Sequence, residues 1–509
     1  MKKDMPGQEM WKRMLCVLLT VVILGVGTSC ISLFNIMVIN GNKYSTLAAK
    51  QQLTTTTIEA KRGTIYDCNG NILATSATVW TVYIAPQDIT DDKEARLIAD
   101  GLAEILDIDA EEIYQKAKKN TAYERIVKRV EEKTAAKVRA FISEHELGSV
   151  VGLDEANKRY YPNGSLASVV LGFVGDDNQG LEGIEYQYDS LLKGVPGKVV
   201  SSKNARGSDM PFNYETMVEA QQGNSLTLTL DSFVQYCVEK HLEEAIDVNA
   251  ATNRGCAIVM NVNTGAIIGM ATKPDYDPNT PFTVTNEYML DMLENYKSKD
   301  PALTEEEAYN KALREQWRNK AIADIYDPGS VFKTVTGSAA EEEGLVNSQS
   351  GFNCPGYIVI AGTRYKCHNT DGHGHQNLSN IYENSCNPAF IEIGQRLGVK
   401  KFYQYFKAYG LTQKTGIDLP GEANSIYYTD QNMGPVELAS ESFGQTFQVS
   451  PIQMITAVCA VANGGYLVKP HVLKEVTDGA GRIVQTEDKS VIRQVISNQT
   501  SKHMCEMLR

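Results

Sequence analysis

The feature that most constrains this chain is a nearly unbroken apolar run from Met14 to Ile39. As an α-helix the run would span roughly 39 Å, more than the ~30 Å hydrocarbon core of a bilayer. A cleaved signal peptide has an apolar region of only ~7–15 residues, so we expect an uncleaved transmembrane helix. Cys30 lies inside the run, and the apolar residues beyond it disfavour a lipoprotein acylation site.

Basic residues precede the apolar run: Lys2, Lys3, Lys12 and Arg13. The excess of Lys and Arg on the cytoplasmic side of membrane proteins predicts the orientation. We expect a cytoplasmic tail over 1–13, a membrane helix over 14–39, and the rest of the chain outside the cytoplasmic membrane. No later segment is apolar enough to span again.

Length and charge limit the function classes. A chain of 509 residues is too long for one core, so two or three domains are expected. The net charge of −13 argues against a nucleic-acid partner and leaves small molecules, carbohydrate or protein as ligands.

Before Gly223 two segments carry readable patterns. Thr54 to Ile72 alternates polar and apolar residues up to Asn69-Gly70, which predicts a β-hairpin. Asp91 to Glu146 is highly charged with a helical period.

A mixed pattern follows over 224–509. Ser225–Leu230 alternates as a strand, and Asp231 is placed to cap an amphipathic helix. Cys256–Thr272 has the pattern of two strands joined by a turn, so the order strand, helix, hairpin predicts an α+β domain. Phe282–Gln316 is acidic and helical, and we interpret it as a solvated surface insertion.

Ser330 and Lys333 are the strongest candidates for chemistry. Asp327-Pro-Gly precedes them and ends the previous segment, so a helix is predicted from Ser330 to Gly344. Residues three apart share one face of a helix. A serine hydroxyl needs an adjacent base to act as a nucleophile, and a lysine kept neutral by burial can supply one. The helix N-terminus also offers N–H groups to a developing oxyanion.

A second element, Ser385-Cys386-Asn387, falls between two predicted helices, where a loop can project a hydroxyl and an amide into a cleft. A helix-cap serine followed by a turn asparagine would have the same pattern. Ser190 and Lys193 repeat the Ser-x-x-Lys spacing, but without the Asp-Pro-Gly lead, and we interpret that match as coincidence.

Further motifs stand in a fixed order. The set is Arg62-Gly-Thr-Ile-Tyr-Asp67, Arg159-Tyr-Tyr-Pro162, Gly183-Ile-Glu185, Gly194-Val-Pro-Gly197, Arg318-Asn-Lys-Ala321, Tyr326-Asp-Pro-Gly-Ser-Val-Phe-Lys333, Asn384-Ser-Cys-Asn-Pro-Ala-Phe390, Thr415-Gly-Ile-Asp-Leu-Pro-Gly-Glu422 and Ala462-Asn-Gly-Gly465. Over nearly the whole chain this set resembles the class B penicillin-binding proteins, with Cys68 in place of the usual arginine. The subtype it resembles most is the septal or sporulation-type transpeptidase of Gram-positive-type bacteria.

The resemblance implies an α+β fold in three parts. An N-terminal transmembrane helix would be followed by an elongated pedestal domain of the dimerisation type over 40–223. A transpeptidase domain, similar to penicillin-binding proteins and β-lactamases, would occupy 224–509.

The family also carries a Lys-Thr/Ser-Gly strand in its cleft, on the order of 100 residues or more after the asparagine of the second motif. Lys414-Thr415-Gly416 matches the letters but comes too early, and Pro420-Gly421 marks a turn just after it, so we interpret it as structural. We therefore expect the transpeptidase domain to be incomplete here and the natural chain to continue past Arg509. The helical pattern of Ser497–Arg509 contains no stop signal, in line with this expectation.

The resemblance also implies roles. Ser330 would attack the penultimate D-alanine carbonyl of a peptidoglycan stem peptide, and Lys333 would take its proton. Ser385 would pass a proton to the departing D-alanine, and Asn387 would hold the peptide. An amine of a neighbouring stem peptide would then complete a cross-link, and β-lactams would acylate the same serine.

The expected partners are donor and acceptor stem peptides, β-lactams and the cytoplasmic membrane, with glycosyltransferase or division-machinery proteins as candidates and no nucleic acid.

Three other functions remain as alternatives. A D-alanyl-D-alanine carboxypeptidase would let water resolve the acyl-enzyme, but the pedestal and anchor favour the transpeptidase. A non-catalytic scaffold of division or sporulation would not need all four candidate side chains. A bifunctional glycosyltransferase would need motifs that are missing between Ile39 and Gly223.

Cysteines and histidines gather in one segment. Cys354 and Cys367 are close enough in sequence for a disulfide, and free buried thiols fit equally well. With His368, His373 and His375 they form a group of donors that zinc accepts. Their spacing matches no standard zinc finger, so we expect no metal and no cofactor.

Overall fold

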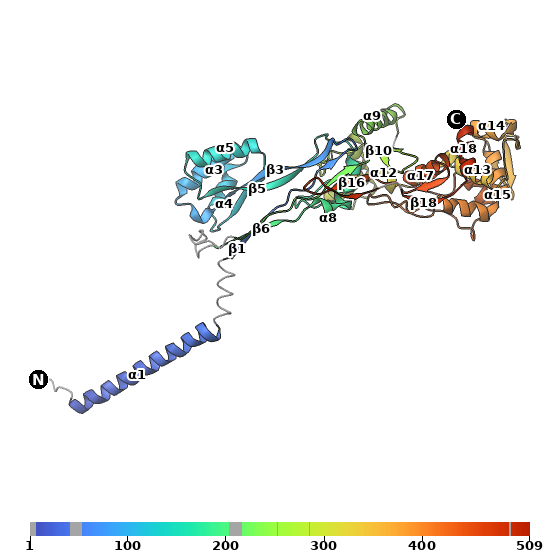
Figure 1. The fold of residues 1–509 in the computed structure, drawn as a ribbon. Helices are drawn as coiled ribbons and strands as arrows, with labels where there is room; N and C mark the ends of the chain where they lie inside the picture. The colour runs from blue at the N-terminus through green and yellow to red at the C-terminus, as the bar shows by residue number, and fades with distance from the viewer. Residues whose placement is uncertain (1–6, 41–52, 203–215, 252, 285, 488–489) are drawn as a thin grey trace.

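The computed structural model describes residues 7–40, 53–202, 216–251, 253–284, 286–487 and 490–509. Figure 1 shows an elongated molecule with the N-terminus at one end and the C-terminal helices at the other. Helices and strands are mixed along the chain, which confirms the α+β prediction.

The N-terminal helix stands apart from the body. Helix α1 (Gln8–Phe34) continues as a π-helical turn (Asn35–Ile39). In the described part of the chain, Met10–Ile39 is the one helix long and apolar enough to cross a membrane. It contains the predicted run from Met14, whereas Lys2 and Lys3 of the basic flank lie outside the described residues.

The predicted hairpin before Ile72 is only partly correct. Strands β2 (Ile65–Tyr66) and β3 (Ile72–Ile84) do pair around Asn69-Gly70. Strand β1 (Leu53–Ile58) instead pairs with β6 (Gly197–Ser202), which also pairs with β7 (Thr216–Val218). Alternation of polar and apolar residues predicts a strand but does not select its partner, which here comes from far along the sequence.

The charged segment after Asp91 is helical with one interruption. Helices α3 (Asp92–Leu106), α4 (Ala110–Ala117) and α5 (Glu132–Glu144) form as expected. The sequence pattern missed strand β4 (Glu124–Val130), which pairs with β3. Only two residues of β4 are buried, so its charged majority hides the alternation. Strand β5 (Val151–Tyr160) pairs with β3 along its length.

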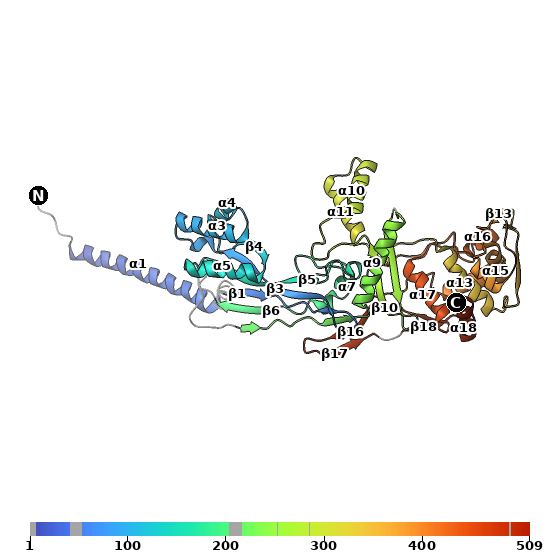
Figure 2. The ribbon, with the colours of Figure 1, turned by 90° about the horizontal axis from the view of Figure 1, so that it is seen from above.

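A seven-stranded sheet joins the two halves of the body. Its order is β17-β16-β8-β2-β3-β4, with β5 also paired to β3. Strand β8 (Ser225–Leu228) runs parallel to β2 and antiparallel to β16 (Leu473–Thr477), which pairs with β17 (Ile483–Thr486). A segment near the C-terminus therefore completes the sheet of the pedestal (Figure 2).

Buried ion pairs hold the pedestal motifs together. Between β5 and β6 the chain forms three short helices: α6 (Ser168–Leu171), α7 (Gly183–Gln187) and α8 (Asp189–Leu192). Glu185 of α7 accepts 2.6 Å bonds from both Arg62 and Arg159, and Arg62 also pairs with Asp189 at 2.6 Å. A buried charge needs a partner of opposite charge. This need explains why three of the sequence motifs each contain one of these charged residues.

The second half begins as predicted. Asp231 caps α9 (Ser232–Val248) by accepting the N–H groups of Phe233 and Val234. Strands β9 (Gly255–Met260) and β10 (Ile267–Lys273) form an antiparallel pair. The acidic insertion is a pair of helices, α10 (Glu287–Lys299) and α11 (Glu305–Trp317), that projects from the body in Figure 2.

The remaining elements extend from the middle of the molecule, where α12 lies beside β10, to its far end (Figure 1). The helices are α12 (Lys320–Ala323), α13 (Lys333–Glu342), α14 (Leu378–Glu383), α15 (Asn387–Ala408), α16 (Pro435–Glu441), α17 (Pro451–Ala462) and α18 (Asn498–Met507). The strands are β11 (Gly351–Cys354), β12 (Tyr357–Ile360), β13 (Thr363–Lys366), β14 (Gly374–Asn377), β15 (Tyr466–Val468) and β18 (Val491–Gln494). Three antiparallel pairs result: β11 with β14, β12 with β13, and β15 with β18.

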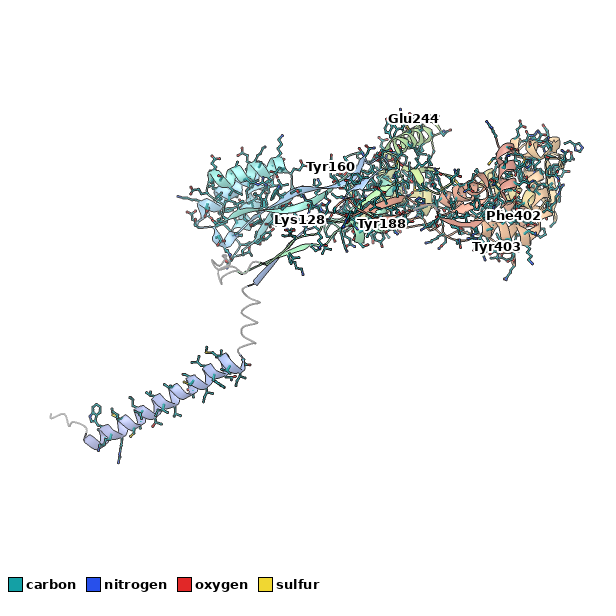
Figure 3. The ribbon with its side chains drawn as sticks, in the orientation of Figure 1. Lys128, Tyr160, Tyr188, Glu244, Phe402 and Tyr403 are labelled. Atoms are coloured by element: carbon teal, nitrogen blue, oxygen red, sulfur yellow. The ribbon has the colours of Figure 1, made fainter. Side chains whose placement is uncertain are left out.

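A hydrogen bond midway along the molecule links the halves. Tyr188 follows α7 of the pedestal and is labelled near the centre of Figure 3. Its hydroxyl donates to Asp418 at 2.9 Å, and Asp418 also accepts the N–H groups of Val472 and Leu473 at 2.7 Å. One carboxylate thus joins the pedestal, the Thr415–Glu422 loop and strand β16.

Candidate active site

The turn that carries Ser330 is pinned by backbone hydrogen bonds. Tyr326 and Val449 exchange N–H···O bonds of 3.0 and 3.1 Å, and the Gly329 N–H donates to the Gly444 carbonyl at 2.8 Å. Gly329 has φ +61°, which glycine adopts without strain. A Cβ on Gly444 would lie 2.0 Å from the Gly329 oxygen, so this close approach requires glycine.

The helix predicted from Ser330 begins as a tighter turn. Residues Gly329–Phe332 form a 3₁₀ turn, and the α-helix proper, α13, starts at Lys333. Phe332 is fully buried and packs against Phe447, with ring centroids 4.7 Å apart. This aromatic contact anchors the buried side of the turn in the core, while Ser330 is exposed to solvent.

Lys333 is buried and makes three hydrogen bonds. Its side-chain nitrogen donates to the Ser385 carbonyl at 2.7 Å, to the Ser385 hydroxyl at 2.9 Å and to Oδ1 of Asn387 at 2.7 Å. Burial lowers the pKa of Lys333 to about 8. At neutral to mildly alkaline pH a useful fraction is therefore the neutral amine, which a general base requires.

Ser385 has an unusual backbone conformation. Its φ of +45° lies in the left-handed region, which a non-glycine residue adopts only when its surroundings hold it there. The N–H groups of Ser385 and Cys386 donate to the carbonyls of Tyr382 and Ile381, both at 3.0 Å. The loop between α14 and α15 is thus locked with the Ser385 side chain turned toward Lys333.

The structure brings Lys333, Ser385 and Asn387 into one hydrogen-bonded group and leaves Ser330 exposed on the adjoining turn. Beside this turn lies an open hollow of about 290 Å³, lined by Cys256, Ala257, Ile258, Tyr326, Val331, Pro451, Met454, Ile455 and Val458. An exposed hydroxyl, a buried amine with a low pKa and a second hydroxyl are the groups that a nucleophile, its base and a proton relay require.

The two other motif matches are placed elsewhere. Ser190 lies on the short helix α8, and Lys193 is well exposed with Asp189 3.9 Å away. Lys414 is also exposed, and Thr415 donates from its N–H and hydroxyl to Glu422 of the same loop at 2.6 and 2.7 Å. Neither match shares the environment of Lys333.

Sequence reasoning missed two contributions to the site. Gly444 supports the Ser330 turn through a backbone contact that no side-chain pattern reveals. Cys386 is fully buried and its thiol lies close to those of Cys354 and Cys367. All three are thiols in the structure rather than a disulfide. The cysteine in the middle of the Ser385-Cys386-Asn387 motif was the sequence feature that could have revealed the second contribution.

Comparison with known proteins identifies the family of both halves of the body. Residues 57–228 match the family described as the penicillin-binding protein dimerisation domain, and residues 255–509 match the penicillin-binding protein transpeptidase domain. Stage V sporulation protein D of Bacillus subtilis is 35% identical over 500 residues, 97% of this chain and 71% of that protein. Peptidoglycan D,D-transpeptidase FtsI of Buchnera aphidicola is 27% identical, over 84% of this chain and 70% of that one. The fold is similar to penicillin-binding protein 2X of Streptococcus thermophilus, with a TM-score of 0.70, 23% identity, and coverage of 89% and 66% of the two chains.

Proposed function

This chain belongs to the class B penicillin-binding proteins, and we propose that it is a serine-type peptidoglycan D,D-transpeptidase. The observation that carries the proposal is the convergence of three hydrogen bonds on the buried amine of Lys333, one turn from Ser330. The names of the relatives support the peptidoglycan substrate.

In the proposed reaction the Ser330 oxygen attacks the penultimate D-alanine carbonyl of a stem peptide. Lys333 accepts the hydroxyl proton as the oxygen–carbon bond forms. The proton passes through Ser385 to the nitrogen of the terminal D-alanine as its carbon–nitrogen bond breaks. The amine of a second stem peptide then attacks the ester, loses its proton to the same groups and leaves Ser330 free. Asn387 orients the peptide by its side-chain amide.

Labelling with a fluorescent penicillin tests the nucleophile. A β-lactam opened by Ser330 stays attached as an ester, so label should appear on the chain and be lost in Ser330→Ala. Ser190→Ala is the matched control, because it removes the serine of the other Ser-x-x-Lys match. Label that persists in Ser330→Ala, or disappears in Ser190→Ala, would refute the assignment.

A donor peptide assay separates the transpeptidase from the carboxypeptidase alternative. With a D-alanyl-D-alanine peptide and an acceptor amine, the transpeptidase forms the amide product, whereas a carboxypeptidase forms the shortened acid with or without acceptor. Failure of both products in protein that still takes up penicillin would favour the scaffold alternative.

We infer the cellular placement from the basic residues before the apolar run and from the length of that run. The tail 1–13 lies in the cytoplasm, the helix 14–39 crosses once, and the pedestal 40–223 carries the transpeptidase domain 224–509 outside the membrane. The similarity to a sporulation protein supports a role in sporulation. A role in division, and glycosyltransferase or division-machinery proteins as partners, belong to the same proposal. Protease added to intact protoplasts should digest everything beyond the anchor, and protection of the large domains would contradict the orientation.

A further inference from the structure

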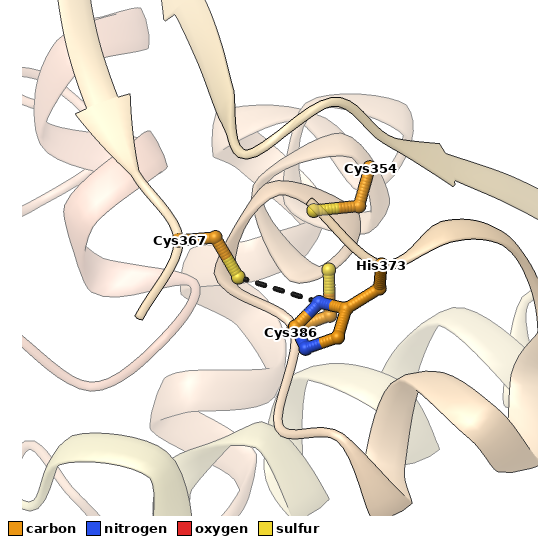
Figure 4. Close-up of side chains that lie close together, drawn as sticks. All are labelled: Cys354, Cys367, His373 and Cys386. Carbon is orange, nitrogen blue, oxygen red and sulfur yellow. Dashed lines mark hydrogen bonds between the residues drawn. The ribbon is translucent and has the colours of Figure 1, made fainter. Parts of the chain in front are cut away.

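Four metal-binding side chains converge beside the candidate active site (Figure 4). Cys354 ends β11, Cys367 follows β13, His373 precedes β14, and Cys386 lies between α14 and α15. Their donor atoms, three Sγ and one ring nitrogen, all lie within 4.8 Å of one another. The sequence analysis considered the first three but not Cys386, because the fourth donor comes from a different segment.

The spacing of the donors fits a tetrahedral ion. Bond lengths of ~2.3 Å to sulfur and ~2.1 Å to nitrogen place neighbouring donors of a tetrahedral Zn²⁺ about 3.5–3.8 Å apart. Sγ of Cys367 and Nδ1 of His373 are 3.6 Å apart, along the dashed line in Figure 4. The other donor pairs lie within 4.8 Å, at most about 1 Å beyond this range.

Backbone geometry prearranges the donors. The turns at Gly356 and Gly372 have φ of +89° and +86° and pack so closely that a Cβ on Gly372 would lie 2.3 Å from the Cys354 carbonyl oxygen. The Cys367 N–H donates to the Gly356 carbonyl at 2.9 Å. The two turns are thus held against each other, with their donors on the same side.

The protonation of the donors differs from one to the next. Burial alone would raise the pKa of Cys354, but N–H groups of His373 and Gly356 and the neighbouring thiols lower it below its usual value. Burial and the charge of His368 lower the pKa of His373. Burial raises the pKa of the Cys386 thiol to about 12, so a bound metal would have to displace that proton.

We propose that Cys354, Cys367, His373 and Cys386 bind a structural Zn²⁺ ion, in place of the metal-free chain expected from the sequence. Three sulfurs and one imidazole nitrogen form a closed four-ligand set, which is typical of structural rather than catalytic zinc. The three cysteines are at most 2% exposed and His373 is half-buried, so protein side chains would fill all four positions. Binding releases a proton from each thiol.

The ion would also position the active site, a consequence that rests on the proposed function. Cys386 separates Ser385 from Asn387, the two residues that bind the amine of Lys333. A Zn–S bond at Cys386 would hold this loop, with Ser385 in its left-handed conformation, against strands β11 to β14. Metal loss would therefore loosen two of the partners of Lys333 without removing any catalytic group.

Metal content tests the site independently of activity. The full chain, purified in detergent with its thiols reduced, should contain about one zinc per chain by elemental analysis. Replacement by Co²⁺ should give the sulfur-to-cobalt absorption and the strong visible bands of a tetrahedral sulfur-rich site. Cys354→Ala and Cys386→Ala should lose the zinc and these bands.

Matched variants control for lost packing. Cys459→Ala removes an equally buried thiol from α17, and His375→Ala removes an exposed histidine two residues from His373. Both should keep one zinc. A metal-free wild-type chain, a disulfide among the three cysteines, or zinc retained by Cys386→Ala would overturn the proposal.

Chelation then tests the positioning role. Removing zinc from the wild-type chain should slow penicillin acylation at least ~10-fold, and added Zn²⁺ should restore it, while Cys386→Ala should not respond to either treatment. Zinc that is bound but has no effect on acylation would overturn the positioning role alone. A zinc-loaded chain that takes up no penicillin would instead refute the proposed function.

Discussion

The side-chain nitrogen of Lys333 lies 2.9 Å from the hydroxyl oxygen of Ser385 and donates a hydrogen bond to it. The two residues belong to motifs separated by 52 positions, and only the packing of α13 against α14 and α15 brings them together. Gly337 allows this packing, because a Cβ there would lie 1.6 Å from the hydroxyl of Tyr382. The contact defines a path along which a proton can leave Lys333.

Replacing Lys333 by methionine should remove the base and keep most of the buried volume. Because general-base catalysis contributes ~10²–10⁴-fold, penicillin acylation should slow by about that factor while the circular dichroism spectrum stays unchanged. Lys414→Met is the matched control, since it alters the exposed lysine of the Lys-Thr-Gly match. Equal loss of acylation in both variants would contradict the assignment of Lys333.

The backbone of Ser385 can be tested separately from its hydroxyl. Ser385→Ala and Ser385→Gly both remove the hydroxyl and should slow acylation to a similar extent. At φ +45° glycine avoids the strain that alanine retains, so the glycine variant should be more stable by about 1 kcal/mol. Thermal melting compares the two. Greater stability of the alanine variant would show that the left-handed conformation carries no strain.

The sequence predicted Ser330 and Lys333 because a nucleophile and its base must share one face of a helix. Ser385 and Asn387 were predicted only through the resemblance to a family, since their pattern alone also fits a helix cap and a turn. It also predicted α9 and the β9–β10 hairpin, where the cap of Asp231 and the turn are local signals. Partners distant in sequence could not be predicted in the same way.

Three such partnerships came from the structure alone. Strand β1 pairs with β6, β16 completes the pedestal sheet, and Cys386 joins the loop of Cys354. Each depends on tertiary packing, and the periodicity of residues predicts an element without predicting its distant partner.

Glu441, at the end of α16, should make stability depend on pH. Burial raises its pKa from 4.5 to about 8, and the N–H of Tyr428 offsets this only in part. A carboxyl whose pKa is raised on folding stabilises the protein fully below pH 4.5, and that contribution is lost as pH rises toward 8. Each pH unit in this window changes the free energy of unfolding by up to ~1.4 kcal/mol.

Glu441→Gln keeps the shape and removes the titration. Its melting temperature should vary less between pH 5 and pH 8 than that of the wild type, and it should be the more stable of the two at pH 8. Glu383→Gln, which alters an exposed carboxylate at the end of α14, is the control. Parallel pH profiles for wild type and Glu441→Gln would contradict the buried neutral carboxyl.

Glu185 should be the most sensitive single position of the pedestal. It is completely buried and accepts 2.6 Å bonds from Arg62 and Arg159, so Glu185→Gln leaves two buried guanidinium groups with one anionic partner, Asp189. Breaking a buried ion pair from one side destabilises by ~3–5 kcal/mol, because the remaining charges stay desolvated.

Hydrogen exchange of β3 and β5 measures this loss where it occurs, since both strands lie beside the ion pairs and report opening of the pedestal. Exchange there should accelerate strongly in Glu185→Gln and remain unchanged in Glu155→Gln, which alters an exposed carboxylate of β5. The network lies far along the chain from α13, so penicillin should still acylate Ser330 at low temperature. Unchanged exchange in Glu185→Gln would show that the arginines find other partners. Loss of acylation at the same temperature would show instead that pedestal and catalytic domain unfold as one unit through the shared sheet.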